Sequence, residues 1–379
     1  MKIALVHDYL VERGGAEKVL AALHEVFPDA PIYTSIYNPD ATLPAFRTAR
    51  VRTSFLQRLT THPGRYRAML PLYPLAFRSF DLSSFDVVLS SASGFAKGVA
   101  PARHARHICY CYTPPRFIWE YQQANAGEQF HLFMRLGLRA LSPYLKRFDR
   151  ASTSTVDRFL TSSRFVADRI ASAYDREATV VPPPIDCRQF APAALRGQFF
   201  LVLSRLVPYK RIDIAIEAFN RNGLSLLVVG DGRDRGRLES LARSDRIRFL
   251  GHRPQREVAA LLARCRALVV AAEEDFGMTP LEANASGRPV IAYGGGGAQD
   301  TVLSGATGVT FSEQTAESLG GAIEEFLGSS FDTATLVRHA WKFDKRQFQK
   351  RMLDLVMEEL DVTRTEGRGA RALTEESAA

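Results

Sequence analysis

Short apolar runs alternate with amphipathic segments along the first half of the chain. Residues 3–6 are an apolar run, followed by a glycine pair and an amphipathic segment at 16–26, which predicts a strand, a turn and a helix. This order is typical of a parallel sheet with crossover helices. The same pattern predicts further strands at 87–89, 105–111 and 179–181 and a further helix at 130–144.

A second series of these units begins near residue 199. Before it, three prolines at 182–184 favour a stiff extended segment, and the linker runs to about Gly197. We therefore predict an α/β protein with two Rossmann-like doubly wound domains, residues 1–190 and 198–343, that face a cleft. In the second domain the pattern predicts strands at 200–203, 224–229, 247–250, 267–271 and 289–292 and helices at 212–220, 235–242, 257–263 and 280–286.

The end of the chain carries one more helical pattern. Phe348, Met352, Leu355 and Val356 recur at helical spacing, so we expect a helix over residues 344–361 that packs back on the first domain. Residues 362–379 are small, charged or polar, which predicts a disordered tail.

The composition fits a protein with two cores. The chain has 379 residues, of which 46% are hydrophobic and 24% charged, and a single core rarely grows beyond about 250–300 residues. The N-terminus turns polar too soon for a signal peptide, and no run reaches about 18 apolar residues, so we expect a cytoplasmic chain without a membrane span.

The four cysteines show no spacing typical of a metal site, and we predict no metal. They indicate a reducing environment. Cys109 and Cys111 alternate along an apolar run, so both should lie on one face of a buried strand.

Two carboxylates frame the segment from Glu274 to Glu282. Glu274 follows a predicted strand, and Glu282 lies on the helix predicted to begin at Pro280. Free backbone N–H groups at such a helix start receive phosphates or hydroxyls, and Gly277 allows a ligand to approach the backbone. Carboxylates accept paired hydroxyls of a ribose or hexose. The alternative is an ordinary helix start with Glu282 at the surface.

Basic and glycine-rich loops follow other predicted strands. Arg205 and Lys210 come after the first strand of the second domain, where they can neutralise a diphosphate, unless this is only a solvated basic loop. Gly14 and Gly15 follow the first strand of the chain, where bare backbone suits an anion or simply a tight turn. The run 294–297 of four glycines could line the same cleft.

Together these segments resemble glycosyltransferase family 4, the retaining transferases with two Rossmann-like domains in the GT-B architecture. The resemblance covers about residues 1–358. It rests on two glutamates eight positions apart with Phe-Gly after the first (Glu274 to Glu282), on Ser-Arg-Leu followed by Lys (Ser204 to Lys210), and on Gly-Gly-Ala-Glu (Gly14 to Glu17). It implies a nucleotide-sugar substrate, retention of anomeric configuration and no metal cofactor.

The resemblance also assigns residue roles. Arg205 and Lys210 would bind the donor diphosphate and, with Glu274, carry the catalysis. Glu274 would contact the donor sugar, and Glu282 would hold the ribose. The remaining donor-binding residues would be Gly15 beneath the phosphates, Phe276, Gly277 and Met278 through their backbone, and His252 and Arg253 near the nucleobase.

Three phrases look like bacterial mannosyltransferases of O-antigen and exopolysaccharide assembly: residues 6–10, 109–119 and 292–297. That subgroup implies GDP-mannose as donor and a polyprenyl-diphosphate-linked saccharide as acceptor. The chain departs from the family at Tyr112, where many members carry a histidine that contacts the donor sugar. Tyr112, Arg116 and Trp119 are the candidates for the acceptor pocket.

A basic and aromatic stretch runs from Phe46 to Phe80. It holds seven arginines, including Arg65 and Arg67, and no acidic residue, in a chain with a formal charge of +8. Such a stretch suits the anionic inner face of a membrane, so we expect peripheral attachment. The alternative is a core-packing helix pair with a basic rim. No nucleic-acid motif accompanies the charge, so we expect no nucleic-acid partner.

Several functions compete. The first is a membrane-associated transferase of lipid-linked saccharides. The second is a soluble transferase that uses a UDP- or ADP-sugar on a free sugar or small metabolite, and the third is a non-catalytic nucleotide-sugar-binding partner. The intact Glu274, Glu282, Arg205 and Lys210 disfavour the third. A dinucleotide oxidoreductase is disfavoured because no Gly-x-Gly-x-x-Gly follows the first strand.

Overall fold

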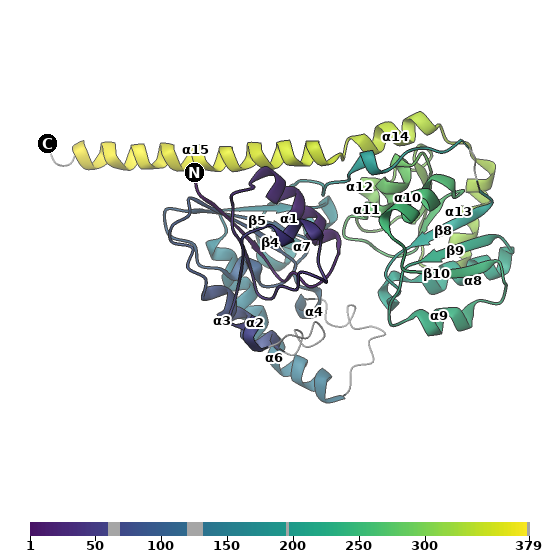
Figure 1. The fold of residues 1–379 in the computed structure, drawn as a ribbon, viewed down its shortest axis with the longest axis horizontal. Helices are drawn as coiled ribbons and strands as arrows, with labels where there is room; N and C mark the ends of the chain where they lie inside the picture. The colour runs from purple at the N-terminus through teal and green to yellow at the C-terminus, as the bar shows by residue number, and fades with distance from the viewer. Residues whose placement is uncertain (60–68, 120–131, 195–196, 377–379) are drawn as a thin grey trace.

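The computed structural model describes residues 1–59, 69–119, 132–194 and 197–376. Figure 1 shows two α/β domains side by side, with one long helix that extends from the second domain across the first. The predicted pair of doubly wound domains is therefore confirmed.

The described strands of the first domain form one parallel sheet in the order β3-β2-β1-β4-β5-β6-β7. The order reverses between β1 and β4, which is the switch point where doubly wound sheets bind ligands. The strands are β1 (Ile3–His7), β2 (Ile32–Thr34), β3 (Val51–Thr53), β4 (Val87–Ala92), β5 (Arg106–Cys111), β6 (Arg158–Thr161) and β7 (Ala178–Val180). The α-helices are α1 (Gly15–Val26), α2 (Leu56–Leu59), α3 (Tyr73–Arg78), α4 (Arg116–Trp119), α6 (Leu132–Ala151) and α7 (Arg164–Tyr174).

The second domain repeats this topology in the order β10-β9-β8-β11-β12-β13, with all pairs parallel and the switch point between β8 and β11. Its strands are β8 (Phe199–Leu203), β9 (Ser225–Val229), β10 (Ile247–Gly251), β11 (Leu268–Val270), β12 (Val290–Tyr293) and β13 (Gly308–Phe311). Its helices are α8 (Ile212–Asn222), α9 (Arg235–Leu241), α10 (Gln255–Arg264), α11 (Met278–Ala285), α12 (Ala298–Thr301), α13 (Ala316–Gly328) and α14 (Thr333–Trp341).

The helix α15 (Lys345–Glu376) returns to the first domain, as predicted, and packs on α1 and β5. Phe348, Met352 and Leu355 are buried there with Tyr110 of β5. The helix also includes residues 362–376, for which the sequence predicted a disordered tail. The difference has a physical reason: alanine, glutamate, arginine and leucine are good helix formers, so their polarity does not prevent a helix from continuing.

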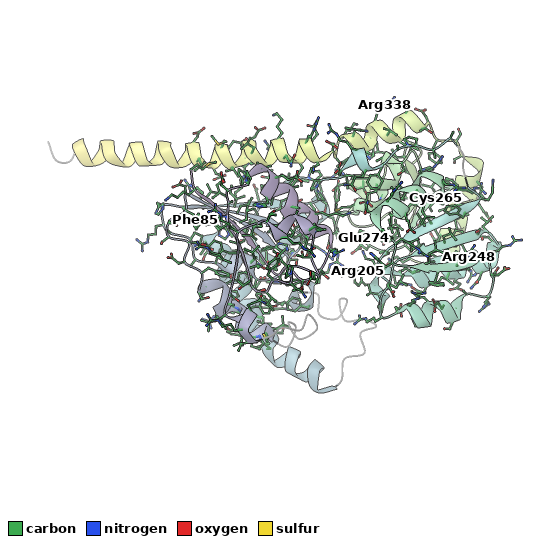
Figure 2. The ribbon with its side chains drawn as sticks, viewed as in Figure 1. Phe85, Arg205, Arg248, Cys265, Glu274 and Arg338 are labelled. Atoms are coloured by element: carbon green, nitrogen blue, oxygen red, sulfur yellow. The ribbon has the colours of Figure 1, made fainter. Side chains whose placement is uncertain are left out.

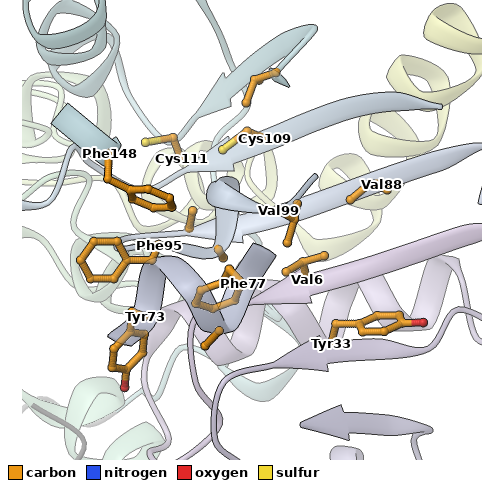
Figure 3. Packing of buried hydrophobic residues seen from close by; sticks show 14 of the residues in the cluster. Val6, Tyr33, Tyr73, Phe77, Val88, Phe95, Val99, Cys109, Cys111 and Phe148 are labelled. Atoms are coloured by element: carbon orange, nitrogen blue, oxygen red, sulfur yellow. The ribbon is translucent and has the colours of Figure 1, made fainter. Parts of the chain in front are cut away.

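Each sheet separates two cores. In the first domain, Cys109 and Cys111 are both fully buried on the same face of β5, which confirms their predicted alternation. Figure 3 shows Phe77, Phe95 and Phe148 packed on this face of the sheet.

A buried ion pair joins the helices beneath this face. Lys97 in the 3-10 turn Ala96–Gly98 contacts the carboxylate of Asp149 on α6. Asp149 also accepts hydrogen bonds of 2.7 Å from Trp119 Nε1 and from Tyr174 Oη. Burial acts to lower the pKa of Lys97, but the charge of Asp149 raises it above its ordinary value. One carboxylate therefore connects α4, α6, α7 and the turn after β4.

Replacing Lys97 with methionine should destabilise the first domain by about 3–5 kcal/mol, because the buried carboxylate of Asp149 then loses the cation that neutralises it. Urea denaturation followed by circular dichroism measures the loss. Arg47→Met is the control, since Arg47 pairs with Asp40 at the exposed surface and should have little effect. Equal urea midpoints for the two variants would contradict the proposed contribution of the buried ion pair to stability.

Candidate functional site

Two predicted site residues meet at the switch point of the second sheet. The loop after β8 ends in a 3-10 turn at Pro208–Lys210, and Glu274 lies on the loop after β11, the strand next to β8. Lys210 Nζ lies 2.5 Å from Oε1 and 2.6 Å from Oε2 of Glu274. Both side chains line one pocket with Ser204 and Thr279. The structure thus brings together a cation and a carboxylate that lie 64 positions apart.

Arg205 lies on the same loop as Lys210. Its guanidinium donates to the hydroxyl of Tyr209 at 2.8 Å. Burial acts to lower the pKa of Arg205, but Tyr209 and the carboxylate of Glu12 raise it above its ordinary value. Because Glu12 precedes α1 of the first domain, Arg205 faces that domain. Figure 2 shows Arg205 and Glu274 on the side of the second domain that faces the first.

The loop after Glu274 is held in place by packing. The Phe276 side chain is buried and contacts the ring of Phe343, with centroids 6.0 Å apart. Gly277 has a φ of 86°, a left-handed conformation that favours glycine, and it caps α11. The helix begins at Met278, two residues before the predicted Pro280, so its free N–H groups lie directly after Gly277.

The glycine run 294–297 serves the same loop. Gly297 N donates to Glu274 O at 2.7 Å, and a Cβ on Gly297 would lie 2.4 Å from the Cα of Phe276. A side chain at Gly297 would therefore displace the Glu274–Phe276 backbone. The glycine run therefore lies at the predicted site, where its backbone packs against the backbone of Glu274–Phe276.

Glu282 on α11 is buried, with 5% of its surface exposed, so the alternative of a surface glutamate is wrong. Its Oε1 lies 3.1 Å from Nζ of Lys18 on α1 of the first domain. Nearby, a Cβ on Gly15 would lie 3.2 Å from Sδ of Met278. The start of α1 and the start of α11 therefore contact each other across the cleft.

Further ion pairs cross between the domains. Oδ1 of Asp275 receives Arg116 Nη2 at 2.5 Å and Arg169 Nη1 at 2.8 Å. Arg164 Nε donates to Asp300 at 2.6 Å. The sequence did not indicate that Asp275 and Arg169 form an ion pair. Asp275 stood inside the recognised motif, but no local pattern marked the helix position of Arg169.

The other acceptor candidates make contacts within the first domain. The Tyr112 hydroxyl donates to Ala16 O at 3.0 Å and lies 2.9 Å from Ser91 Oγ, and burial raises the pKa of Tyr112 well above its ordinary value. The Trp119 indole packs against the first core and bonds to Asp149. The Tyr112 hydroxyl therefore holds the start of α1 next to Gly15, and the Trp119 side chain fixes α4 to the first core. An acceptor role for either residue stays a prediction.

The predicted nucleobase residues follow β10. His252 is exposed, and Arg253 Nη1 lies 3.8 Å from Oε2 of Glu257. In the sheet, β10 is two strands from β8, a separation of about 10 Å. That spacing suits a nucleoside whose diphosphate lies at Lys210, although the base contact itself stays a prediction.

Among the described residues, no group of three or more His, Cys, Asp or Glu is placed to hold a metal ion. Within the same residues, no helix is long and apolar enough to cross a membrane.

Family comparisons cover both domains. Residues 13–189 match the model of "Glycosyltransferase Family 4", and residues 188–342 match that of "Glycosyl transferases group 1". Each domain of the chain therefore matches a glycosyltransferase family model. The Gly14–Glu17 motif lies in the segment that the first of these models matches, and the Ser204–Lys210 and Glu274–Glu282 motifs lie in the segment that the second matches.

Relatives of this chain differ in their named activities. It is 31% identical over 188 residues to glycogen synthase of Mycobacterium tuberculosis, a match that covers 45% of each chain. It is 30% identical over 224 residues to a GDP-mannose-dependent alpha-(1-6)-phosphatidylinositol monomannoside mannosyltransferase of Mycolicibacterium smegmatis, which covers 50% of this chain and 58% of the relative. The matches span about half the length of these relatives.

Solved structures extend the likeness in fold to almost the whole chain. Sucrose-phosphate synthase from Thermosynechococcus elongatus has a TM-score of 0.74 at 18% identity, over 96% of this chain and 100% of that one. Anabaena HepE in complex with UDP has a TM-score of 0.69 at 18% identity, over 94% of this chain and 100% of that one. These likenesses confirm the GT-B fold.

Replacing Arg169 with methionine should loosen the contact between the two domains. The substitution removes one of two guanidinium groups on Asp275. At about 1 kcal/mol for a partly exposed pair, the ratio of closed to open molecules falls roughly fivefold. Small-angle X-ray scattering should then give a larger radius of gyration than for the wild type, and high salt should shift the wild type in the same direction.

Arg158→Met is the matched control, because Arg158 pairs with Glu358 and Glu359 of α15 without crossing the cleft. It should leave the scattering curve unchanged. If Arg169→Met and Arg158→Met scatter alike, the Asp275 contacts do not hold the domains together.

Proposed function

We propose that the chain is a retaining hexosyltransferase that moves mannose from GDP-mannose to a lipid-linked saccharide in cell-surface polysaccharide synthesis. The observation that carries the proposal is the pairing of Lys210 with Glu274 at the switch point of the second sheet, with Arg205 on the same loop as Lys210. A switch point is where such folds bind ligands, and this one offers cations for phosphates and a carboxylate for sugar hydroxyls.

The charges match a diphosphate leaving group. In the proposed reaction, the bond from the anomeric carbon to the diphosphate oxygen breaks and its electron pair goes to that oxygen. An acceptor hydroxyl bonds to the same face of the carbon, and the leaving phosphate takes its proton. Arg205 and Lys210 stabilise the departing diphosphate, while Glu274 holds sugar hydroxyls. Because these side chains supply the positive charge, we propose that no resident metal is required.

The choice of donor rests on the subgroup phrases and on the relatives. One relative is named as GDP-mannose-dependent, whereas another is a glycogen synthase and one structural neighbour is solved with UDP. A UDP- or ADP-sugar transferase acting on a free sugar is therefore the second candidate. A non-catalytic nucleotide-sugar-binding role is the third, and the assembled Lys210–Glu274 pair disfavours it.

A lipid-linked acceptor agrees with the surface of the first domain. Leu75 is 61% exposed on α3, and Leu59, Leu72 and Phe55 are exposed nearby in sequence. Arginines share this stretch, so apolar and basic side chains both reach the surface. The alternative of core packing holds for Leu56, Tyr73 and Phe77, which are buried. Arg65 and Arg67 lie outside the described residues. We propose that this surface attaches the enzyme to an anionic membrane.

Lys210→Ala should lower the turnover of GDP-mannose about 100- to 1,000-fold, because charge stabilisation of the leaving group is lost. Arg205→Ala should act in the same direction. Release of GDP, measured with a phosphatase-coupled assay in membranes that contain the acceptor, provides the rate. UDP-glucose and ADP-glucose assayed in parallel should give much slower release than GDP-mannose.

Arg248→Ala is the control for these variants, because Arg248 is an exposed arginine on β10 outside the proposed site. It should retain full turnover. Wild-type rates for Lys210→Ala would refute the catalytic assignment, and faster release from a UDP- or ADP-sugar would replace GDP-mannose with the second candidate.

Replacing Leu72 and Leu75 with glutamate should prevent the protein from floating with vesicles of phosphatidylglycerol and phosphatidylcholine. The exchange removes two exposed apolar groups and adds negative charge where each basic residue contributes about 1 kcal/mol of attraction. Leu303→Glu, an exposed leucine of the second domain, should float as the wild type does. Absence of wild-type flotation at low salt would rule out the attachment.

A further inference from the structure

Among the acidic residues of the segment 274–282, which we call the donor segment, Glu282 has the least exposed carboxylate. Its side chain is 7% exposed, against 23% for Glu274 and 30% for Asp275. A buried carboxylate is stable in its charged form only with a cation or with hydrogen-bond donors. In this structure Lys18 supplies the cation, at 3.1 Å.

Lys18 reaches Glu282 from the other domain. It lies in the first turn of α1, three residues after Gly15, and α1 begins at a well-fixed point: Gly14 N donates to Glu17 Oε2 at 2.8 Å, and the Tyr112 hydroxyl donates to Ala16 O at 3.0 Å. The helix start is held, but the Lys18 side chain itself is 41% exposed. Its ammonium group can therefore return to water without displacing α1.

Lys18 and Glu282 differ in how well each charge is solvated once the pair separates. When the pair separates, water solvates the half-exposed ammonium group of Lys18. The carboxylate of Glu282 is only 7% exposed, so it then requires another hydrogen-bond donor. The 2′- and 3′-hydroxyls of a ribose are such donors, because a carboxylate accepts two parallel hydrogen bonds. Lysine and ribose would approach Glu282 from the same cleft, so each excludes the other.

We propose that Lys18 is a further residue of the donor site: it occupies the carboxylate of Glu282 until the ribose hydroxyls of the donor replace it. The proposal rests on the proposed function, in which Glu282 holds the ribose. Lys18 therefore opposes ribose recognition and couples donor binding to the contact between α1 and α11.

Calorimetric titration of the full chain with GDP and with 2′,3′-dideoxy-GDP tests the exchange, and UDP with its dideoxy form serves in parallel. The readout is the ratio of the two dissociation constants, which isolates the ribose hydroxyls from base and phosphate. Lys18→Met should raise the preference for the ribonucleotide about threefold, as expected for loss of a partly exposed competing pair. Lys18→Arg should restore the wild-type ratio.

Lys345→Met is the matched control, since Lys345 pairs with Glu25 away from the cleft, and it should leave the ratio unchanged. If Lys18→Met keeps or lowers the preference while Glu282→Gln abolishes it, the exchange is refuted and the proposed function stands. If the wild type binds neither nucleotide, or Glu282→Gln leaves its preference intact, the ribose assignment fails and the exchange fails with it.

Discussion

A parallel sheet brings the carboxyl ends of its strands to one edge, and the whole candidate site depends on that constraint. The segments that carry Arg205, Lys210 and Glu274 are far apart in sequence, but they follow β8 and β11, which are adjacent at the switch point. The first sheet has its own switch point between β1 and β4, and the loop after β1 leads into Gly15 and α1. The site forms where these two edges meet.

Charge of opposite sign holds the two edges together. Two of the pairs between the domains, Arg169 with Asp275 and Lys18 with Glu282, take their acidic partner from the segment 274–282 and their basic partner from the first domain. In the proposed function these carboxylates lie at the donor site, so a ligand that engages one of them would also alter the contact between the domains.

The fold was predictable because it rests on local patterns, and local motifs also marked the residues of the candidate site, whose donor role stays a prediction. Alternating strands and helices indicated two doubly wound sheets, and short motifs marked Glu274, Lys210 and their neighbours. The strands β2 and β13, of three and four residues, were missed because each is too short to show a clear period. The Lys18–Glu282 pair joins residues 264 positions apart, and only the packing of two domains brings them together.

Tyr112 stands where many members of the family that the sequence resembles carry a histidine, and the structure gives this tyrosine a supporting role. Its hydroxyl bonds to Ser91, whose Oγ also lies 3.0 Å from Nδ1 of His7. The same hydroxyl holds Ala16 O, so strand ends β1, β4 and β5 all support the start of α1 through this small network. A side chain committed in this way shapes the site by fixing the backbone at Gly15. In the proposed function, the chemistry at the sugar then falls to groups on the opposite edge, Glu274 and Lys210, whose carboxylate and ammonium contact each other.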